Sequence, residues 1–271
     1  MIAACLKLID RRPEVVPLTA DVHLNARTSG PSAADLAALE WALRLGEATR
    51  TEVLAVTAGP PAADAMLREA LATGATRAIR VDLATRAPSE SMAARIARAL
   101  PATVDIVVCG DGSLDRGSGA VPAFLAAHRG AAQALGLVNL TIAGPTLIAE
   151  RRLDGGRRER LRVVPPAVLS FEGASARLRR ASVDGAVHAR EAAITVFSGP
   201  SSSPQRQPAR TGPYRPRPRV LPSPADPDPR QRILSLTGAL ARHDPPQRLV
   251  LDPATAAERL LDQLRRWGYL D

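Results

Sequence analysis

Residues 52–83 read EVLAVTAGPPAADAMLREALATGATRAIRVDL, and this stretch decides the fold class. The apolar run after Glu52 stops at Gly59 and two prolines, which is typical of a buried strand. From Ala62 the apolar residues take up helical spacing, and this pattern ends at Gly74. A second apolar run, RAIRVDL, follows. Strand, helix and strand in this order predict a right-handed crossover between parallel strands.

The same alternation continues on both sides of this stretch. On the N-terminal side, residues 2–9 predict a first buried strand, and residues 13–26 predict a small hairpin. Residues 32–48 predict a helix that opens with Ser32 and Asp35 as a capping box. On the C-terminal side, residues 89–100 and 118–127 predict helices around a strand at 104–110. The expected fold class is α/β, a Rossmann-like parallel sheet with helices on both faces.

Beyond Leu137 the pattern changes. TLIAERRL, a tight turn at 154–156, RRERLRVV and PAVLSFEG predict an antiparallel meander at the edge of the same sheet. Residues 199–230 are rich in Pro, Ser and Arg, which favours a linker. Residues 254–267 predict an amphipathic helix. We therefore expect an α/β domain at 1–198, a linker at 199–230 and a helical C-terminal arm at 231–271. The arm either packs on its own domain or docks on a partner subunit.

Composition narrows the function classes. The formal net charge is +9, yet Lys7 is the only lysine, the arginines are scattered and only 3% of residues are aromatic. Scarce stacking platforms argue against nucleic acid as a partner and favour an acidic protein. Cys5 and Cys109 lie in apolar runs, which indicates buried thiols in a reducing compartment. With no basic leader and no long apolar segment, we expect a cytoplasmic protein without direct membrane insertion.

The loops at the carboxyl ends of the strands are the candidate ligand site, because open α/β sheets bind ligands there. The most informative loop, GDGSLDRGSG at 110–119, follows a buried strand and leads into a helix. Its glycines let backbone N–H groups reach a phosphate at a helix N-terminus. The alternative is a plain strand-to-helix loop in which Ser118 caps the helix. The sequence matches neither a P-loop nor a dinucleotide fingerprint.

Side-chain catalysis and metal binding find no support in the pattern. No Ser/His/Asp or Cys/His set has an interpretable spacing, so we assign no catalytic residue. His128, His188 and His243 are dispersed without paired ligands, which favours surface residues over a metal site.

Several ordered motifs resemble the beta subunit of electron transfer flavoproteins. Residues 5–10, CLKLID, are similar to the family's VKRVPD, and SAADLAALEWALRL at 32–45 is similar to NPxxExALEEALRL. The stretch at 52–79 and DRGSGAVPAFLA at 115–126 resemble the family's next strand and helix and its nucleotide loop, DGDTGQVGPMLA. ERRLDGG, PPAVLSF and DPPQR at 244–248 follow in the family's order.

The resemblance implies an electron carrier that forms a heterodimer with an alpha subunit and is not itself an enzyme. The redox FAD would be shared with that alpha subunit, and AMP or a second FAD would occupy the beta-subunit site. Electrons would arrive from donor dehydrogenases and leave toward a quinone-linked acceptor of the respiratory chain. The positions that match the family's cofactor site are Cys5, Lys7, Ser32, Ala33, Ala34, Asp35, Ala58, Gly59, Gly110, Asp111, Gly112, Ser113, Leu114, Asp115, Arg116, Gly117, Ser118 and Gly119.

The chain also departs from the family's pattern. Ser32 replaces a common Asn and Ala120 replaces a Gln, which removes side-chain hydrogen bonds to the nucleotide. In the segment at 172–192, similar to the family's partner-recognition segment, Val183 takes the place of a leucine and Arg179 and Arg180 accompany it. Arg152 stands where the family has an acidic residue.

These departures, with the long Arg/Pro linker, resemble the branch encoded beside mycofactocin biosynthesis genes, which would make mycofactocin-linked dehydrogenases the donors. Two other interpretations stay open. One is a stand-alone adenine-nucleotide module of the universal-stress-protein type, and the other is a basic nucleic-acid-binding protein.

Overall fold

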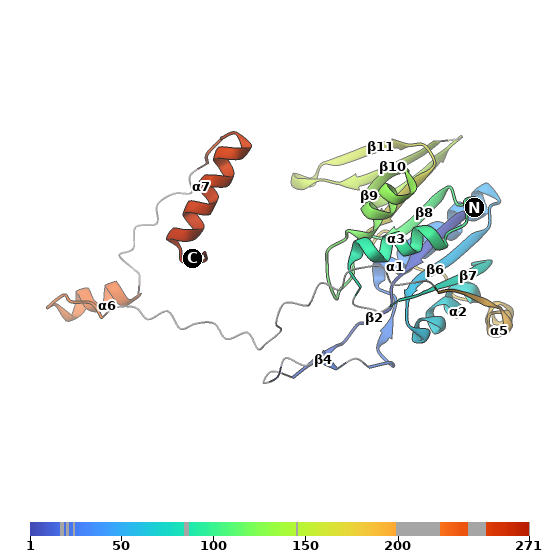
Figure 1. Cartoon of the computed structure of the whole chain (residues 1–271), viewed down its shortest axis with the longest axis horizontal. Helices are drawn as coiled ribbons and strands as arrows, with labels where there is room; N and C mark the ends of the chain where they lie inside the picture. Colours follow the sequence, from blue (N-terminus) through green and yellow to red (C-terminus); the bar gives the residue numbers. More distant parts are fainter. Residues whose placement is uncertain are drawn as a thin grey trace. The chain divides into compact units, whose positions relative to one another are not determined.

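The computed structural model describes residues 1–16, 19, 22–23, 25–83, 87–144, 146–198, 223–237 and 248–270. The chain divides into two compact units, residues 1–213 and 214–271. Figure 1 shows their helices and strands.

The first unit alternates strands and helices. Its helices are α1 (Ala33–Thr49), α2 (Asp64–Thr73), α3 (Ser89–Ala99), α4 (Val121–Arg129) and α5 (Val183–Glu191), with short 3-10 turns η1 (Pro61–Ala63) and η2 (Asp154–Gly156). Its strands are β1 (Ile2–Leu6), β2 (Ile9–Asp10), β3 (Glu14–Val15), β4 (Val22–His23), β5 (Ser29–Gly30), β6 (Val53–Gly59), β7 (Arg77–Asp82), β8 (Ile106–Gly110), β9 (Ala132–Ala143), β10 (Thr146–Arg152), β11 (Arg158–Val163), β12 (Ala167–Phe171) and β13 (Ile194–Phe197).

Within the described residues, the main sheet has nine strands in the order β11-β10-β9-β12-β8-β1-β6-β7-β13. The strands from β9 to β13 in this order pair in parallel, and β10 pairs antiparallel with both β9 and β11. The expected α/β class, with its parallel sheet and antiparallel edge, is confirmed. The small hairpin expected at 13–26 is present as the β3–β4 pair.

One part of the expected meander is wrong. PAVLSF forms β12, which lies between β8 and β9 and pairs in parallel with both. All five of its residues are buried, because helices cover both faces of the sheet at that position. The antiparallel pairing instead joins β10 to the long strand β9, a strand that the sequence analysis did not assign. An unbroken apolar run marks a central parallel strand better than an edge strand.

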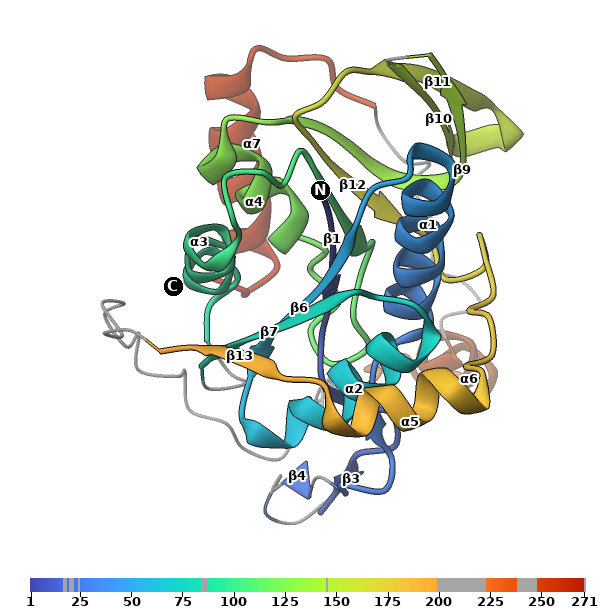
Figure 2. The same ribbon diagram turned by 90° about the vertical axis from the view of Figure 1, so that its right-hand side faces the viewer.

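The helices cover both faces of this sheet. Figure 2 shows α1 and α2 on one side and α3 and α4 on the other. The side of α1 and α2 holds a core that includes Leu39, Trp41 and Phe171, and the indole and phenyl rings stack with centroids 5.0 Å apart. The side of α3 and α4 holds a second core that includes Leu125 and Val168. Since both faces are buried, the central strands are mostly apolar, with Thr57 of β6 and Ser170 of β12 as buried polar exceptions.

The start of α1 follows from its sequence. The Ser32 hydroxyl accepts a hydrogen bond from the Asp35 backbone N–H at 3.1 Å, and the Asp35 carboxylate accepts one from the Ser32 backbone N–H at 3.1 Å. This is the capping box expected from the two residues.

The helix expected from residue 118 begins later than predicted. Its N-cap is Ala120, without a side-chain cap, and Pro122 lies in the first turn. Gly119 has φ +56°, outside the range of a right-handed helix, so α4 cannot extend back to Ser118. Ser118 is therefore not the N-cap.

The second unit contains α6 (Pro229–Thr237) and α7 (Pro253–Arg266). Helix α7 confirms the expected amphipathic helix, and the Asp252 carboxylate caps it by accepting from the backbone N–H groups of Ala254 and Thr255. Helix α6 begins at the end of the expected linker. Residues 199–222 of that linker lie outside the described residues, so its predicted character stays a prediction. No helix among the described residues is long and apolar enough to cross a membrane.

Candidate functional site

A pocket opens where the direction of the sheet topology switches. From β1 the chain first adds β6 and β7 on one side and then returns to place β8 on the other. The carboxyl ends of β1, β6 and β8 therefore meet at one edge, where open α/β sheets bind ligands. Cys5, Ala58 and Gly110, one from each strand, line a hollow there that encloses about 660 Å³, open solvent included.

Among the described residues, Lys7 is one of two basic residues at this pocket, the other being Arg116. Its ammonium donates to the Ser113 hydroxyl at 3.0 Å and to the Asp115 carboxylate at 2.6 and 2.7 Å. The Lys7 side chain is 20% exposed. Burial raises the pKa of Asp115, but the hydrogen bonds from Lys7 and Ser113 outweigh it and hold that pKa below its ordinary value. The ion pair ties the end of β1 to the loop after β8.

Asp35 is a buried acid that also lines the pocket. Its residue is 6% exposed, and the Ser32 hydroxyl donates to its carboxylate at 2.8 Å. Burial raises the pKa of Asp35 to about 6, although hydrogen bonds from Ser32 and the nearby charge of Lys7 oppose this. A carboxylate held only by neutral groups at a helix N-terminus is costly to ionise when water is excluded.

Close contacts explain why glycine stands at the last position of β8 and at one position of the loop after it. A Cβ on Gly110 would lie 2.9 Å from Asp35 Oδ1 and 3.0 Å from the Ala34 carbonyl carbon, so glycine lets the start of α1 cross the end of β8. A Cβ on Gly119 would lie 2.5 Å from the Asp111 carbonyl oxygen. Gly117 also has positive φ, +63°, but nothing lies within 4 Å of its Cβ position. The loop is therefore folded tightly at Gly119 and open at Gly117.

The structure brings ten of the expected cofactor positions together around the hollow. These are Cys5, Lys7, Asp35, Ala58, Gly110, Gly112, Ser113, Arg116, Ser118 and Gly119. The other expected positions lie beside it without lining it: Ser32, Ala33 and Ala34 form the start of α1, Gly59 ends β6, and Asp111, Leu114, Asp115 and Gly117 lie in the loop. Leu114 is 77% exposed, so it points away from the protein.

Sequence reasoning missed the pocket residues that come from helices. Ser89, Met92 and Ile96 of α3 and Val121 and Pro122 of α4 also line the hollow. The apolar spacing of α3 indicates that Met92 and Ile96 face the sheet. It could not indicate that they lie at the carboxyl end of β1, because that depends on where α3 packs.

The expected partner-recognition residues differ in their surroundings. Val183, the first residue of α5, is 84% exposed, and Arg180 is exposed. The Arg152 guanidinium pairs with the Glu172 carboxylate of the same chain. Arg179 is held by two acids of α1, Glu40 and Glu47.

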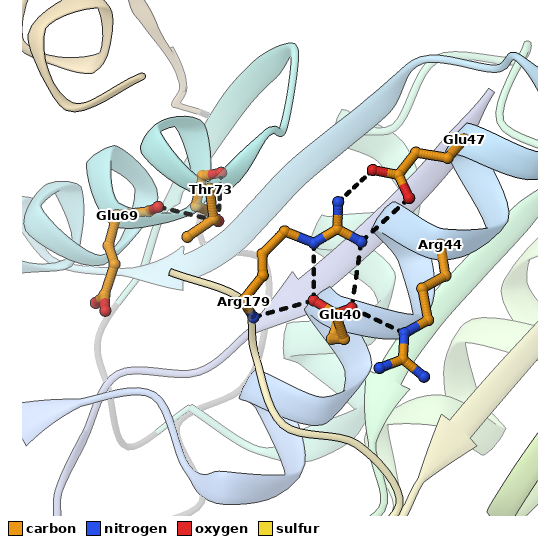
Figure 3. A network of polar contacts seen from close by, with 7 residues as sticks. Glu40, Arg44, Glu47, Glu69, Thr73 and Arg179 are labelled. Carbon is orange, nitrogen blue, oxygen red and sulfur yellow. Dashed lines mark hydrogen bonds and ion pairs between the residues drawn. The ribbon is translucent and has the colours of Figure 1, made fainter. Parts of the chain in front are cut away.

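Figure 3 shows how Arg179 is held. Its Nε and backbone N–H donate to Glu40 Oε2 at 3.0 and 3.1 Å, and Arg44 Nε donates to Glu40 Oε1 at 2.8 Å. The Arg179 guanidinium also forms an ion pair with Glu47. Burial raises the pKa of Glu40, but the two arginines outweigh it and hold the pKa below its ordinary value. Arg179 thus fastens residues 172–182 to α1, a role inside the subunit.

A metal centre is not part of this arrangement within the described residues, which contain no group of three or more His, Cys, Asp or Glu side chains placed to hold an ion.

Comparison with known proteins decides the family. Residues 23–200, about two thirds of the chain, match the model of the electron transfer flavoprotein domain. The chain belongs to the electron transfer flavoprotein family, as a beta-type subunit. The resemblance drawn from the sequence motifs is thereby confirmed.

Individual relatives of this family agree. Protein FixA of Azorhizobium caulinodans is 29% identical over 73% of this chain and 74% of its own length. The electron transfer flavoprotein subunit beta of Mycobacterium tuberculosis is 31% identical over 59% of this chain and 64% of its own length. The acryloyl-CoA reductase electron transfer subunit gamma of Anaerotignum propionicum is 27% identical over 57% of this chain and 61% of its own length. The names of these last two relatives state an electron transfer role.

Proposed function

We propose that this electron transfer flavoprotein subunit binds AMP, or a second FAD, in the pocket at the ends of β1, β6 and β8. The observation that carries the proposal is the placement of Lys7, the only lysine in the chain, at the mouth of a hollow beside the start of α4. An ammonium and a helix N-terminus together favour a phosphate. The apolar side chains of Met92 and Ile96 would take the base.

The redox cofactor of the proposed complex is an FAD shared with an alpha subunit. Relatives of this chain are named as an electron transfer subunit and as an electron transfer flavoprotein subunit. The chain would act as a carrier and not as an enzyme. Donor dehydrogenases, mycofactocin-linked ones among them, would reduce the flavin, and a quinone-linked acceptor would oxidise it. No nucleic acid enters this scheme, and the carrier would work in the cytoplasm.

Two surfaces fit the proposed protein partners. Helix α5 presents Val183 and Val187, 84% and 53% exposed, which suits contact with a donor dehydrogenase. In the second unit, Leu260 of α7 and Trp267 directly after this helix are 65% and 64% exposed. We place the alpha subunit on this helical arm, at 231–271, with residues 199–230 as the linker.

Co-expression with a candidate alpha subunit tests the proposal. A one-to-one complex with flavin absorbance, releasing AMP or FAD from a second site on denaturation, is expected. A chain that stays colourless and monomeric beside every plausible alpha subunit would contradict the heterodimer. A complex with one flavin and no second nucleotide would contradict the pocket assignment alone. Affinity for duplex DNA that falls steeply with salt would instead favour a nucleic-acid-binding protein.

A matched pair of loop variants tests the pocket. Gly119→Ala and Gly117→Ala both place a side chain at positive φ, which costs about 1 kcal/mol, but only the first adds a clash with the Asp111 carbonyl. AMP affinity should therefore fall about tenfold more in Gly119→Ala, measured by isothermal titration calorimetry. Equal affinities would remove the loop from the binding site.

A truncation tests the arm. Deletion of residues 199–271 should weaken assembly with the alpha subunit and leave the α/β unit folded, as judged by gel filtration and circular dichroism. Unchanged assembly would remove the arm from the interface.

A further inference from the structure

Two thiols lie next to each other at the floor of the pocket. Cys5 of β1 and Cys109 of β8 are direct register partners in neighbouring parallel strands. Neighbouring strands lie about 4.8 Å apart. Disulfides join Cα atoms separated by roughly 4.4 to 6.8 Å. The strand spacing therefore places the two Cα atoms within the range of a bridge.

The direction of the two side chains also suits a bridge. Register partners in a sheet point to the same face. Cys5 and Cys109 belong to the same core, on the side of α3 and α4, together with Ala3 and Val107. Both are free cysteines in the structure.

Access to the pair is narrow but present. Cys5 is 7% exposed and Cys109 is 3% exposed, and both line the hollow. A small solute that enters the pocket reaches the wall to which both residues contribute, whereas burial keeps out the thiol of another protein. We therefore expect Cys5 and Cys109 of one chain to react with each other and not with a cysteine of another chain.

The surroundings of Cys109 disfavour its thiolate form. Interaction with the Cys5 thiol, together with burial and the nearby Asp35, raises the pKa of Cys109 well above its ordinary value. The thiolate is the reactive form, so Cys109 reacts slowly near neutral pH and faster as the pH rises.

We propose that Cys5 and Cys109 form a dithiol modification site that a small peroxide oxidises to a disulfide within the chain. One sulfur attacks hydrogen peroxide and becomes a sulfenic acid, and one water leaves. The second sulfur attacks the sulfenic sulfur, the S–S bond forms and a second water leaves. Two thiols together lose two electrons and two protons, and the peroxide is reduced to two waters.

The experiment uses the full-length folded chain and hydrogen peroxide. After exposure, the chain is denatured and its remaining thiols are alkylated with N-ethylmaleimide, and intact mass and digested peptides are measured. The expected product has lost two hydrogen atoms, takes up no reagent and yields one peptide pair that joins residues 5 and 109. Its rate of formation rises with pH. Two alkylated thiols under conditions that fully oxidise glutathione, separate sulfinic acids, or disulfides between chains would each overturn the proposal.

Single variants and AMP sharpen the result. Cys5→Ala and Cys109→Ala, each checked for folding by circular dichroism, should give no linked peptide pair. AMP at ten times its Kd should slow the oxidation by about tenfold, an arm that rests on the proposed nucleotide site. Oxidation that AMP does not slow leaves the dithiol site intact and counts against the nucleotide assignment, so the two failures are distinguishable.

Discussion

The first turn of α1 borders the pocket and carries Asp35, whereas the middle of the same helix faces residues 172–182 and carries Glu40. Both residues are buried, 6% and 4% exposed. Asp35 receives hydrogen bonds from Ser32 and has a pKa raised to about 6. Glu40 receives hydrogen bonds from two guanidinium groups and has a lowered pKa.

Two carboxyl groups that are equally buried have pKa values shifted in opposite directions, because different groups contact them. Burial penalises both charged forms, and the two guanidinium groups outweigh this penalty at Glu40, whereas the hydrogen bonds from Ser32 do not outweigh it at Asp35. The middle of α1 is thus built for stability. Its first turn carries Asp35, which is costly to ionise and lies beside the proposed ligand. Shifted pKa values of this kind are common at functional sites.

The largest expected effect is on the pH dependence of stability. The pKa of Asp35 is about 6 in the folded chain against an ordinary 3.8. The folded state therefore retains a proton that the unfolded state has released, and the free energy of unfolding falls as the pH rises from 4 to 6. The fall from this group is about 3 kcal/mol. Asp35→Asn should abolish it, as measured by urea denaturation across this range.

The matched control is Asp184→Asn, an exposed acid in the first turn of α5. It should leave the pH profile as in the wild type. Parallel profiles for Asp35→Asn and the wild type would show that Asp35 is not the titrating group.

The next largest effect is expected on the free energy of unfolding, from the ion pair between Arg179 and Glu40. Arg179→Gln removes one of its two guanidinium partners and leaves a buried carboxylate with Arg44 alone. The free energy of unfolding should fall by about 2 kcal/mol, less than for a wholly unpaired buried charge. Thermal and urea denaturation at pH 7 measure it.

Arg180→Gln is the control for this variant, since Arg180 is the neighbouring residue and is exposed. Its effect should stay within about 0.5 kcal/mol. If the two variants were equally stable, the network of Figure 3 would contribute nothing measurable.

The smallest effect is expected at Lys7. The Lys7–Asp115 pair is partly exposed, 20% and 36% for the two side chains, so Lys7→Gln should lower the free energy of unfolding by about 0.5 kcal/mol. Because the Lys7 charge lowers the pKa of Asp35, its removal should move that pKa further up. Carboxyl titration by NMR measures this shift, and a pKa that falls would contradict the assigned electrostatics.

The sequence determined the parts of this protein that depend on near neighbours. Apolar runs and helical spacing located the central strands and α1 to α3, and Ser32 and Asp35 marked the start of α1. The glycine-rich loop at 110–119 could be placed at the carboxyl edge of the sheet, because the end of a parallel strand fixes its place there.

Only the tertiary structure decided what depends on distant partners. It placed β12 in the middle of the sheet, started α4 at Val121 and brought Met92 to the pocket. It also brought Arg179 into hydrogen-bond contact with Glu40, 139 residues away, and placed Cys5 beside Cys109 in the sheet. Periodicity records which face of an element is buried, but the partner on that face is chosen by packing between segments far apart in the chain.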